Sequence, residues 1–142
     1  MPFREKRAWI SLITILLVSS IYFTYLVIVT HSENPPRFHY LAHLALVAVF
    51  AFVLLDVALH VGLYWLSPVD SRMPRDEREL LIEFKATRIA FIILVMLSMI
   101  VAAVIVHVNG DYWLLGNIVI MAVVISELVN YGMRILYYCR GI

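Results

Sequence analysis

The stretch AWISLITILLVSSIYFTYLVIVT fills residues 8–30 without a single charged side chain. Three more long apolar segments follow it, at residues 40–66, 89–106 and 112–136. A helix needs roughly 20 apolar residues to cross a hydrocarbon core about 30 Å thick, and each segment is close to that length or longer. Because lipid offers no water to exposed peptide groups, such segments must bond their own backbone as helices. The sequence therefore predicts four transmembrane helices.

The composition agrees with a membrane protein and excludes other classes. Hydrophobic residues make up 63% of the chain and charged residues 15%, whereas a soluble domain has about a quarter charged residues. The net charge of +1 and the absence of a basic stripe give no reason to expect a nucleic-acid partner. The single Cys139 cannot form an internal disulfide. The lipid bilayer is the partner that the composition indicates.

The positive charges are distributed unevenly between the two sides of the predicted membrane domain. If the N-terminus is cytoplasmic, only Arg37 of the eleven Lys and Arg residues lies outside. Cytoplasmic loops carry an excess of Lys and Arg, so this orientation is favoured and both termini are predicted to be cytoplasmic. The residues on the cytoplasmic side are then Arg4, Lys6, Arg7, Arg72, Arg75, Arg78, Lys85, Arg88, Arg134 and Arg140.

The links on the outer side are short and rich in turn formers. Pro35 and Pro36 interrupt the first link, and residues 109–111 read Asn-Gly-Asp in the second. Short links place sequence neighbours side by side and antiparallel. We therefore expect one all-α transmembrane domain over residues 1–142, an up-down-up-down bundle with helices at about 8–30, 39–66, 75–107 and 112–138.

The longest polar segment, SPVDSRMPRDERELLIEFKATR, covers residues 67–88 on the predicted cytoplasmic side. Pro74 suits the first turn of a helix, and the acidic residues after it suit the positive end of the helix dipole. The third helix would then project about three turns below the hydrocarbon. This helix start either sets the insertion depth or forms a docking surface for a cytoplasmic partner or a second copy. Its residues are Asp76, Glu77, Arg78 and Glu79.

Several polar side chains fall inside the predicted spans, where they are costly and often functional. One pair lies a turn apart on the second helix, and a stripe at helical spacing follows the fourth helix. Both groups lie roughly two-thirds of the way across from the outer side, so we expect one intramembrane cluster in the cytoplasmic half. Its members are Asp56, His60, Arg88, Glu127, Asn130, Tyr131 and Arg134, with Ser11 and Thr14 nearby.

Two interpretations of this cluster remain open. Asp56 and Glu127 balance Arg88 and Arg134, as a paired structural network requires. Alternatively, His60 beside a carboxylate could relay protons in a proton or cation channel or transporter. The apolar run of residues 89–106 offers no charged group toward the outer half, which favours the structural network.

Histidines gather near the predicted outer face, and they suggest a metal or haem site as a further alternative. His39 and His43 are four residues apart, a spacing that lets two imidazoles hold one ion. Histidines also anchor helices at the headgroup level, so no resident cofactor is expected. A haem between His43 and His60 is excluded, because these residues are about 25 Å apart along one helix. The candidate metal ligands are His31, His39, His43 and His107.

No recognisable catalytic motif is present, so the sequence leans away from an enzyme. Alanines at residues 42, 45, 48 and 51 and Gly116 supply small side chains that let membrane helices approach closely, within one chain or between chains. We therefore expect a small accessory, scaffold or regulatory membrane protein that forms a homo-oligomer or binds a membrane-protein partner.

Short matches along the whole chain resemble a family of small, uncharacterised four-helix proteobacterial inner-membrane proteins. They are Phe3-Arg4-Glu5-Lys6 with Ala8-Trp9, then Asp76-Glu77-Arg78-Glu79 followed by Ile82, then Glu127, Tyr131, Ile135-Leu136-Tyr137 and Arg140-Gly141. The family tends to end in Tyr-Arg-Arg-Gly, whereas this chain has Cys139 in place of the first Arg. The resemblance implies a bacterial inner-membrane location and a four-helix fold, and it implies no activity.

The charge asymmetry generates a direct test of topology. A reporter enzyme that is active only in the periplasm, fused after Arg140, should give no activity, because the C-terminus is expected inside. The same reporter inserted between residues 109 and 110 should be active. Strong activity at the C-terminal fusion would contradict the predicted orientation.

Overall fold

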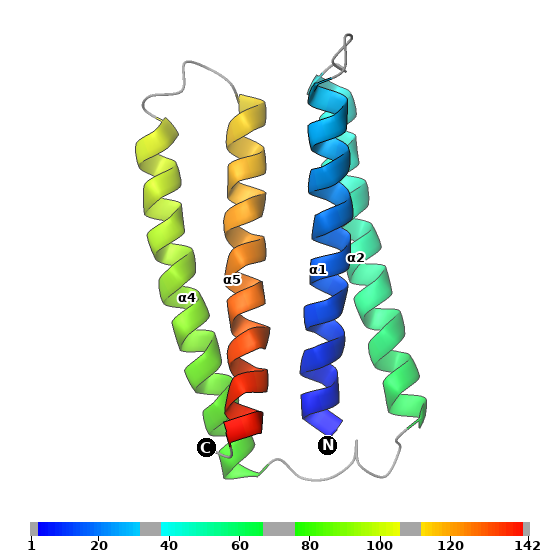
Figure 1. Ribbon diagram of the computed structural model, residues 1–142, viewed down its shortest axis with the longest axis vertical. Coiled ribbons are helices and arrows are strands. Elements are labelled where there is room, and N and C mark those ends of the chain that lie inside the picture. Colours follow the sequence, from blue (N-terminus) through cyan, green and yellow to red (C-terminus); the bar gives the residue numbers. More distant parts are fainter. Residues whose placement is uncertain (1–2, 32–37, 67–75, 106–111, 141–142) are drawn as a thin grey trace.

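The computed structural model describes residues 3–31, 38–66, 76–105 and 112–140, and this part of the chain is built of four long helices. These are α1 (Phe3–Thr30), α2 (Phe38–Leu66), α4 (Glu77–Ile105) and α5 (Tyr112–Arg140) (Figure 1). Each has 28 or 29 residues, about 42 to 44 Å at 1.5 Å per residue, which exceeds the hydrocarbon thickness. The prediction of an all-α chain with four helices able to cross a membrane is confirmed.

The start of α4 is fixed by its own side chains. Asp76 precedes the helix, and its carbonyl accepts the first helical bond from the Leu80 amide at 3.2 Å. The Glu79 carboxylate accepts a hydrogen bond from the Asp76 amide at 3.4 Å. The bond from Asp76 to Glu79 is one half of a capping box, in which the third helical residue reaches back to the residue before the helix. The earlier start expected at Pro74 falls outside the described residues.

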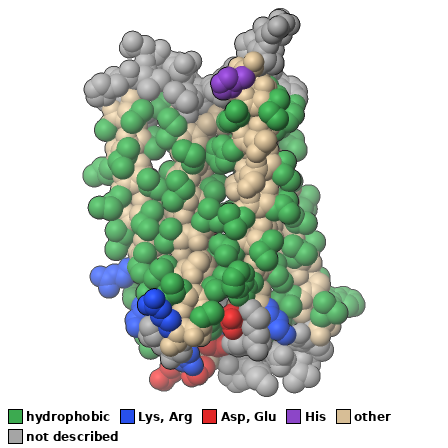
Figure 2. Space-filling view, in the orientation of Figure 1, with side chains coloured by type: hydrophobic (Ala, Val, Ile, Leu, Met, Phe, Trp, Pro, Cys, Tyr) green, Lys and Arg blue, Asp and Glu red, His purple; other side chains and the backbone are tan. Residues whose placement is uncertain are grey.

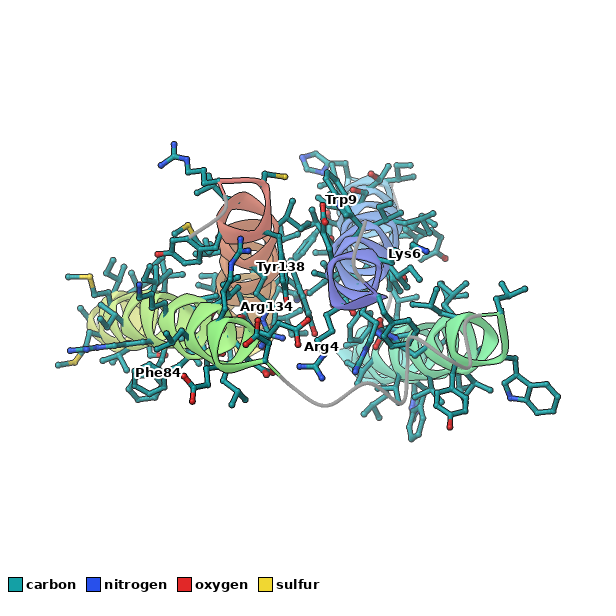
Figure 3. All side chains as sticks on the ribbon, turned by 90° about the horizontal axis from the view of Figure 1, so that it is seen from below. Arg4, Lys6, Trp9, Phe84, Arg134 and Tyr138 are labelled. Carbon is teal, nitrogen blue, oxygen red and sulfur yellow. The ribbon has the colours of Figure 1, made fainter. Side chains whose placement is uncertain are left out.

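The helices pack in the order α4, α5, α1, α2 (Figure 1). The central neighbours, α5 and α1, are the last and first helices in the sequence. Residue pairs give the directions. On α1 and α2, Ser11 meets Asp56 whereas Tyr22 packs near Ala45, so these helices are antiparallel. The end-on view shows α2 and α4 on opposite sides of the row (Figure 3). Among the described residues, α2 and α4 share no interface comparable to those of α4 with α5, α5 with α1, and α1 with α2. The packing of the described helices is therefore an open row.

Small side chains make the closest interface, between α4 and α5. Ala86, Ala90 and Ala122 are buried there, and the buried Ser126 hydroxyl donates a hydrogen bond to the Ala90 carbonyl at 2.8 Å. Small residues matter in lipid, because helices there associate through close packing and hydrogen bonds rather than through the hydrophobic effect. On α2, Ala45 and Ala48 pack against the Tyr22 and Leu26 cluster of α1. A side chain at Gly116 would meet open space.

The outside of the molecule is apolar over most of its length. No described side chain of α2 is buried, and Trp65 is 79% exposed. Hydrophobic side chains cover the middle of the visible face, whereas charged side chains gather at the lower end (Figure 2). Water-exposed apolar surface of this extent is not tolerated by soluble monomers, so the surface is suited to lipid.

Candidate functional site

A polar cavity of about 220 Å³ lies at the end of the molecule where α1 begins and α5 ends. All four helices contribute to its wall. Arg4, Arg134 and Tyr138 point into the space between the helices, whereas Phe84 points outward from α4 (Figure 3). The residues that line the cavity are Phe3, Arg4, Arg7, Ala8, Ser11, His60, Glu79, Ile82, Glu83, Tyr131, Arg134 and Tyr138.

The first polar group of the site joins α1 to α2. The Ser11 side chain is 1% exposed, and its hydroxyl donates a hydrogen bond to Asp56 Oδ1 at 3.0 Å. His60 Nδ1 lies 3.3 Å from Asp56 Oδ2 and 2.7 Å from the Asp56 carbonyl oxygen. His60 Nε2 lies 3.4 Å from Ser11 Oγ. The expected Asp56 and His60 pair is therefore brought together, and Ser11 holds both side chains from the neighbouring helix.

The Asp56 group has a simple proton chemistry. A neutral imidazole with its proton on Nδ1 leaves Nε2 as an acceptor toward Ser11, whose hydroxyl proton is already directed at Asp56. Protonation of His60 would turn Nε2 into a donor toward the same hydroxyl oxygen. In either form of the ring the Ser11 hydroxyl proton is directed at Asp56, so Ser11 bridges the two side chains.

The second polar group runs along α5 and reaches α4. Asn130 Nδ2 donates to Glu127 Oε2 at 3.2 Å, and Asn130 Oδ1 accepts from Arg134 Nε at 3.1 Å. Arg134 Nη1 lies 3.2 Å from Glu83 Oε1, and Nη2 donates to Thr87 Oγ1 at 3.3 Å. Asn130 therefore stands between Glu127 and Arg134, where a direct ion pair was one of the expected arrangements.

Tyr131 and Arg4 complete the connections of the cavity. Tyr131 and Ser11 both line the cavity, from α5 and α1, and the Arg134 guanidinium lies 5.5 Å from the centre of the Tyr131 ring. Arg4 Nη1 lies 2.7 Å from Glu79 Oε2, which joins the start of α1 to the start of α4. Both side chains of this ion pair are about a quarter exposed or less.

Arg88 stands apart from the cluster in which the sequence placed it. It is exposed and does not line the cavity, and Glu83, which was not predicted, supplies the α4 charge instead. The reason is helix rotation. Arg88 is two residues beyond the fully buried Ala86, about 200° around the helix, and so lies on the opposite face. The buried stripe of Ile82, Ala86 and Ala90 would have indicated which acidic residue faces inward.

The predicted helix-start residues have separate roles in the structure. Glu79 faces the cavity and pairs with Arg4, whereas Asp76, Glu77 and Arg78 are exposed. These three line a second depression of about 380 Å³, which adjoins the cavity at Ile82. Its other lining residues are Leu81, Ile82, Lys85 and Tyr137.

The candidate metal ligands are only partly described. His31 is exposed, and its Nδ1 lies 2.9 Å from the Val27 carbonyl oxygen of its own helix. His43 is exposed on α2. The His39 side chain and His107 lie outside the described part. Among the side chains that the structure does describe, no three His, Cys, Asp or Glu residues are placed to hold one ion.

An apolar groove of about 430 Å³ lies beyond the polar cavity, between α1, α2 and α5. Glu127 lines one part of it and is the member of the polar network that reaches this groove. Tyr22, another lining residue, donates a hydrogen bond to Asn117 Oδ1 at 2.6 Å and so joins α1 to α5. The polar groups that line the cavity thus lie at one end, and the walls of the groove beyond them are mostly apolar.

Comparison of the chain with protein-family models, curated proteins and solved structures finds no match. The chemistry of the site is therefore interpreted from its own geometry.

The central position of Arg134 generates a stability test. Arg134→Gln removes its ion pair with Glu83 and its bond to Thr87, so the free energy of unfolding should fall by about 1 to 3 kcal/mol. Unfolding in mild detergent by added dodecyl sulfate, followed by tryptophan fluorescence, measures this change. Arg88→Gln is the matched control, because Arg88 is exposed on α4. Equal small effects of both substitutions would show that the network does not hold α4 to α5.

Proposed function

We propose that the chain is an integral protein of a bacterial inner membrane, crossing it in an up-down-up-down order with both termini in the cytoplasm. Four helices long and apolar enough to span a bilayer support this placement. Both chain ends lie at the same end of the molecule, the end where charged side chains gather (Figures 1 and 2). The resemblance to small proteobacterial inner-membrane proteins supports the choice of membrane.

Within that membrane the proposed role is that of an accessory, scaffold or regulatory protein, not an enzyme, that works with a second copy or with another membrane protein. The pairing of the cavity charges supports it. Arg4 with Glu79 and Arg134 with Glu83 satisfy one another across helices, as a structural network requires. The polar cavity then holds the four helices together at their cytoplasmic end.

The observation that carries this role is the depression at the start of α4. Glu77, Arg78 and Lys85 are exposed there with both signs of charge, around the 56% exposed apolar side chain of Leu81. An apolar residue within a polar rim is the usual anatomy of a protein interface. The depression is separate from the paired charges of the cavity, so a partner can bind it without disturbing the fold.

Site-specific photocrosslinking tests the docking role. A benzophenone amino acid at Leu81, expressed in bacterial cells, should give one defined protein adduct, either a second copy or another protein. Combining it with Glu77→Lys alone should abolish the adduct, because the reversed charge then faces a like charge on either kind of partner. The same amino acid at Ile92, an exposed apolar position farther along α4, should give no protein adduct. No adduct at Leu81, or one that persists after charge reversal, would argue against docking.

Proton or cation transport is the second candidate, and the Asp56, His60 and Ser11 group favours it. These side chains are in contact at the cavity, and an imidazole beside a carboxylate is the pairing that a proton relay needs. Glu127 lies at the far end of the polar network, on the way toward the other side. Beyond Glu127, the groove walls are valine, isoleucine, phenylalanine and alanine side chains, with Ser19 and Tyr22 as the polar exceptions. Because this stretch offers few polar groups, the accessory role is the first candidate.

A flux measurement separates the two candidates. The purified protein is placed in vesicles that contain a pH-sensitive dye, and valinomycin imposes a potassium diffusion potential. The interior of these vesicles should acidify no faster than that of protein-free vesicles. The reason is that apolar side chains interrupt the polar path beyond Glu127. Acidification that is faster than in protein-free vesicles and is removed by Glu127→Gln or Asp56→Asn would establish transport instead.

A further inference from the structure

The groove between α1, α2 and α5 has the size and the walls of a small-molecule site. Its volume of about 430 Å³ falls within the range of roughly 300 to 1,000 Å³ that ligand pockets occupy. Aromatic rings of Tyr22, Phe23 and Phe52 contribute to its walls, together with valine, isoleucine and alanine side chains. Val49 and Val119, which also line it, are exposed at the surface, so the groove is reachable from the surrounding lipid.

Glu127 is the one charged group among the described residues that line this groove. Its partner is the Asn130 amide, a neutral donor at 3.2 Å. The nearest basic side chain of the network, Arg134, is bonded instead to Glu83, Thr87 and the oxygen of Asn130. A carboxylate inside the membrane is stabilised by a positive charge, and the described side chains do not place one against Glu127.

We propose that this groove binds a lipophilic cation, whose positive group lies at the Glu127 carboxylate and whose apolar body lies along the groove. Charge complementarity selects the cation, and the nearly apolar walls select a ligand that enters from lipid rather than from water. The aromatic rings add favourable contacts with a positive charge. The inference rests on the proposed membrane placement and supplies a ligand class for the regulatory role.

Binding of tetraphenylphosphonium tests the proposal. Protein in nanodiscs of zwitterionic lipid is dialysed against the radiolabelled cation, and binding to empty nanodiscs is subtracted. Saturable binding near one cation per chain is expected. Glu127→Gln should weaken it by about tenfold or more, a factor that corresponds to about 1.4 kcal/mol. Glu127→Asp keeps the charge and should retain most of the binding. Glu5→Gln removes a carboxylate outside the groove as the matched control and should leave cation binding unchanged.

Two further measurements keep the test decisive. Ala48→Phe narrows the groove and leaves the Glu127 carboxylate in place, and it should abolish binding. An unchanged midpoint of unfolding by dodecyl sulfate shows that the helices of this variant still pack. Uncharged triphenylphosphine oxide should not compete. Equal binding by the wild type and Glu127→Gln, or no saturable binding, would overturn the proposal. A dimer that Ala48→Phe converts to monomer, with cation binding unchanged, would show that a second copy occupies the groove. None of these outcomes alters the photocrosslinking result at Leu81.

Discussion

The peptide group cannot leave its hydrogen bonds unmade in hydrocarbon, and the architecture of this chain depends on that constraint. Each long apolar segment bonds its own backbone as a helix, whether or not its side chains are buried. The α2 helix shows this most clearly, because none of its described side chains is buried by the rest of the chain. Its secondary structure needs no tertiary core, and lipid covers what the protein leaves exposed.

Because lipid removes the hydrophobic force between helices, a few polar contacts define how the helices meet. Ser11 with Asp56 joins α1 to α2, and Tyr22 with Asn117 joins α1 to α5. The Ser126 hydroxyl joins α5 to α4, as does the ion pair of Arg134 with Glu83, and Arg4 with Glu79 joins α1 to α4. Each contact sets the register of one pair of helices. Small buried alanines then allow α4 and α5 to approach closely.

How far the sequence predicts the structure depends on the kind of contact. The four apolar helices follow from segment length and from the need for backbone bonding, which are local properties. The pair of Asp56 and His60 also follows, because four residues make one helical turn. Arg88 was placed in the cluster and Glu83 was not considered, since depth in the membrane was taken into account without rotation about the helix. The ion pair of Arg4 with Glu79 could not be predicted, because the two residues are far apart in the sequence. No local pattern indicates which helices face each other.

The central seam between α1 and α5 has a consequence for the order in which the molecule is made. The α1 and α2 pair and the α4 and α5 pair each form from neighbouring segments, so each can assemble as soon as its second helix leaves the ribosome. The seam joins Tyr22 to Asn117, residues separated by 95 positions. Until α5 is synthesised, the α1 face that will contact it is covered by lipid or by another protein. The first two helices thus form a hairpin that waits for α5, the helix that supplies the hydrogen-bond partner of Tyr22.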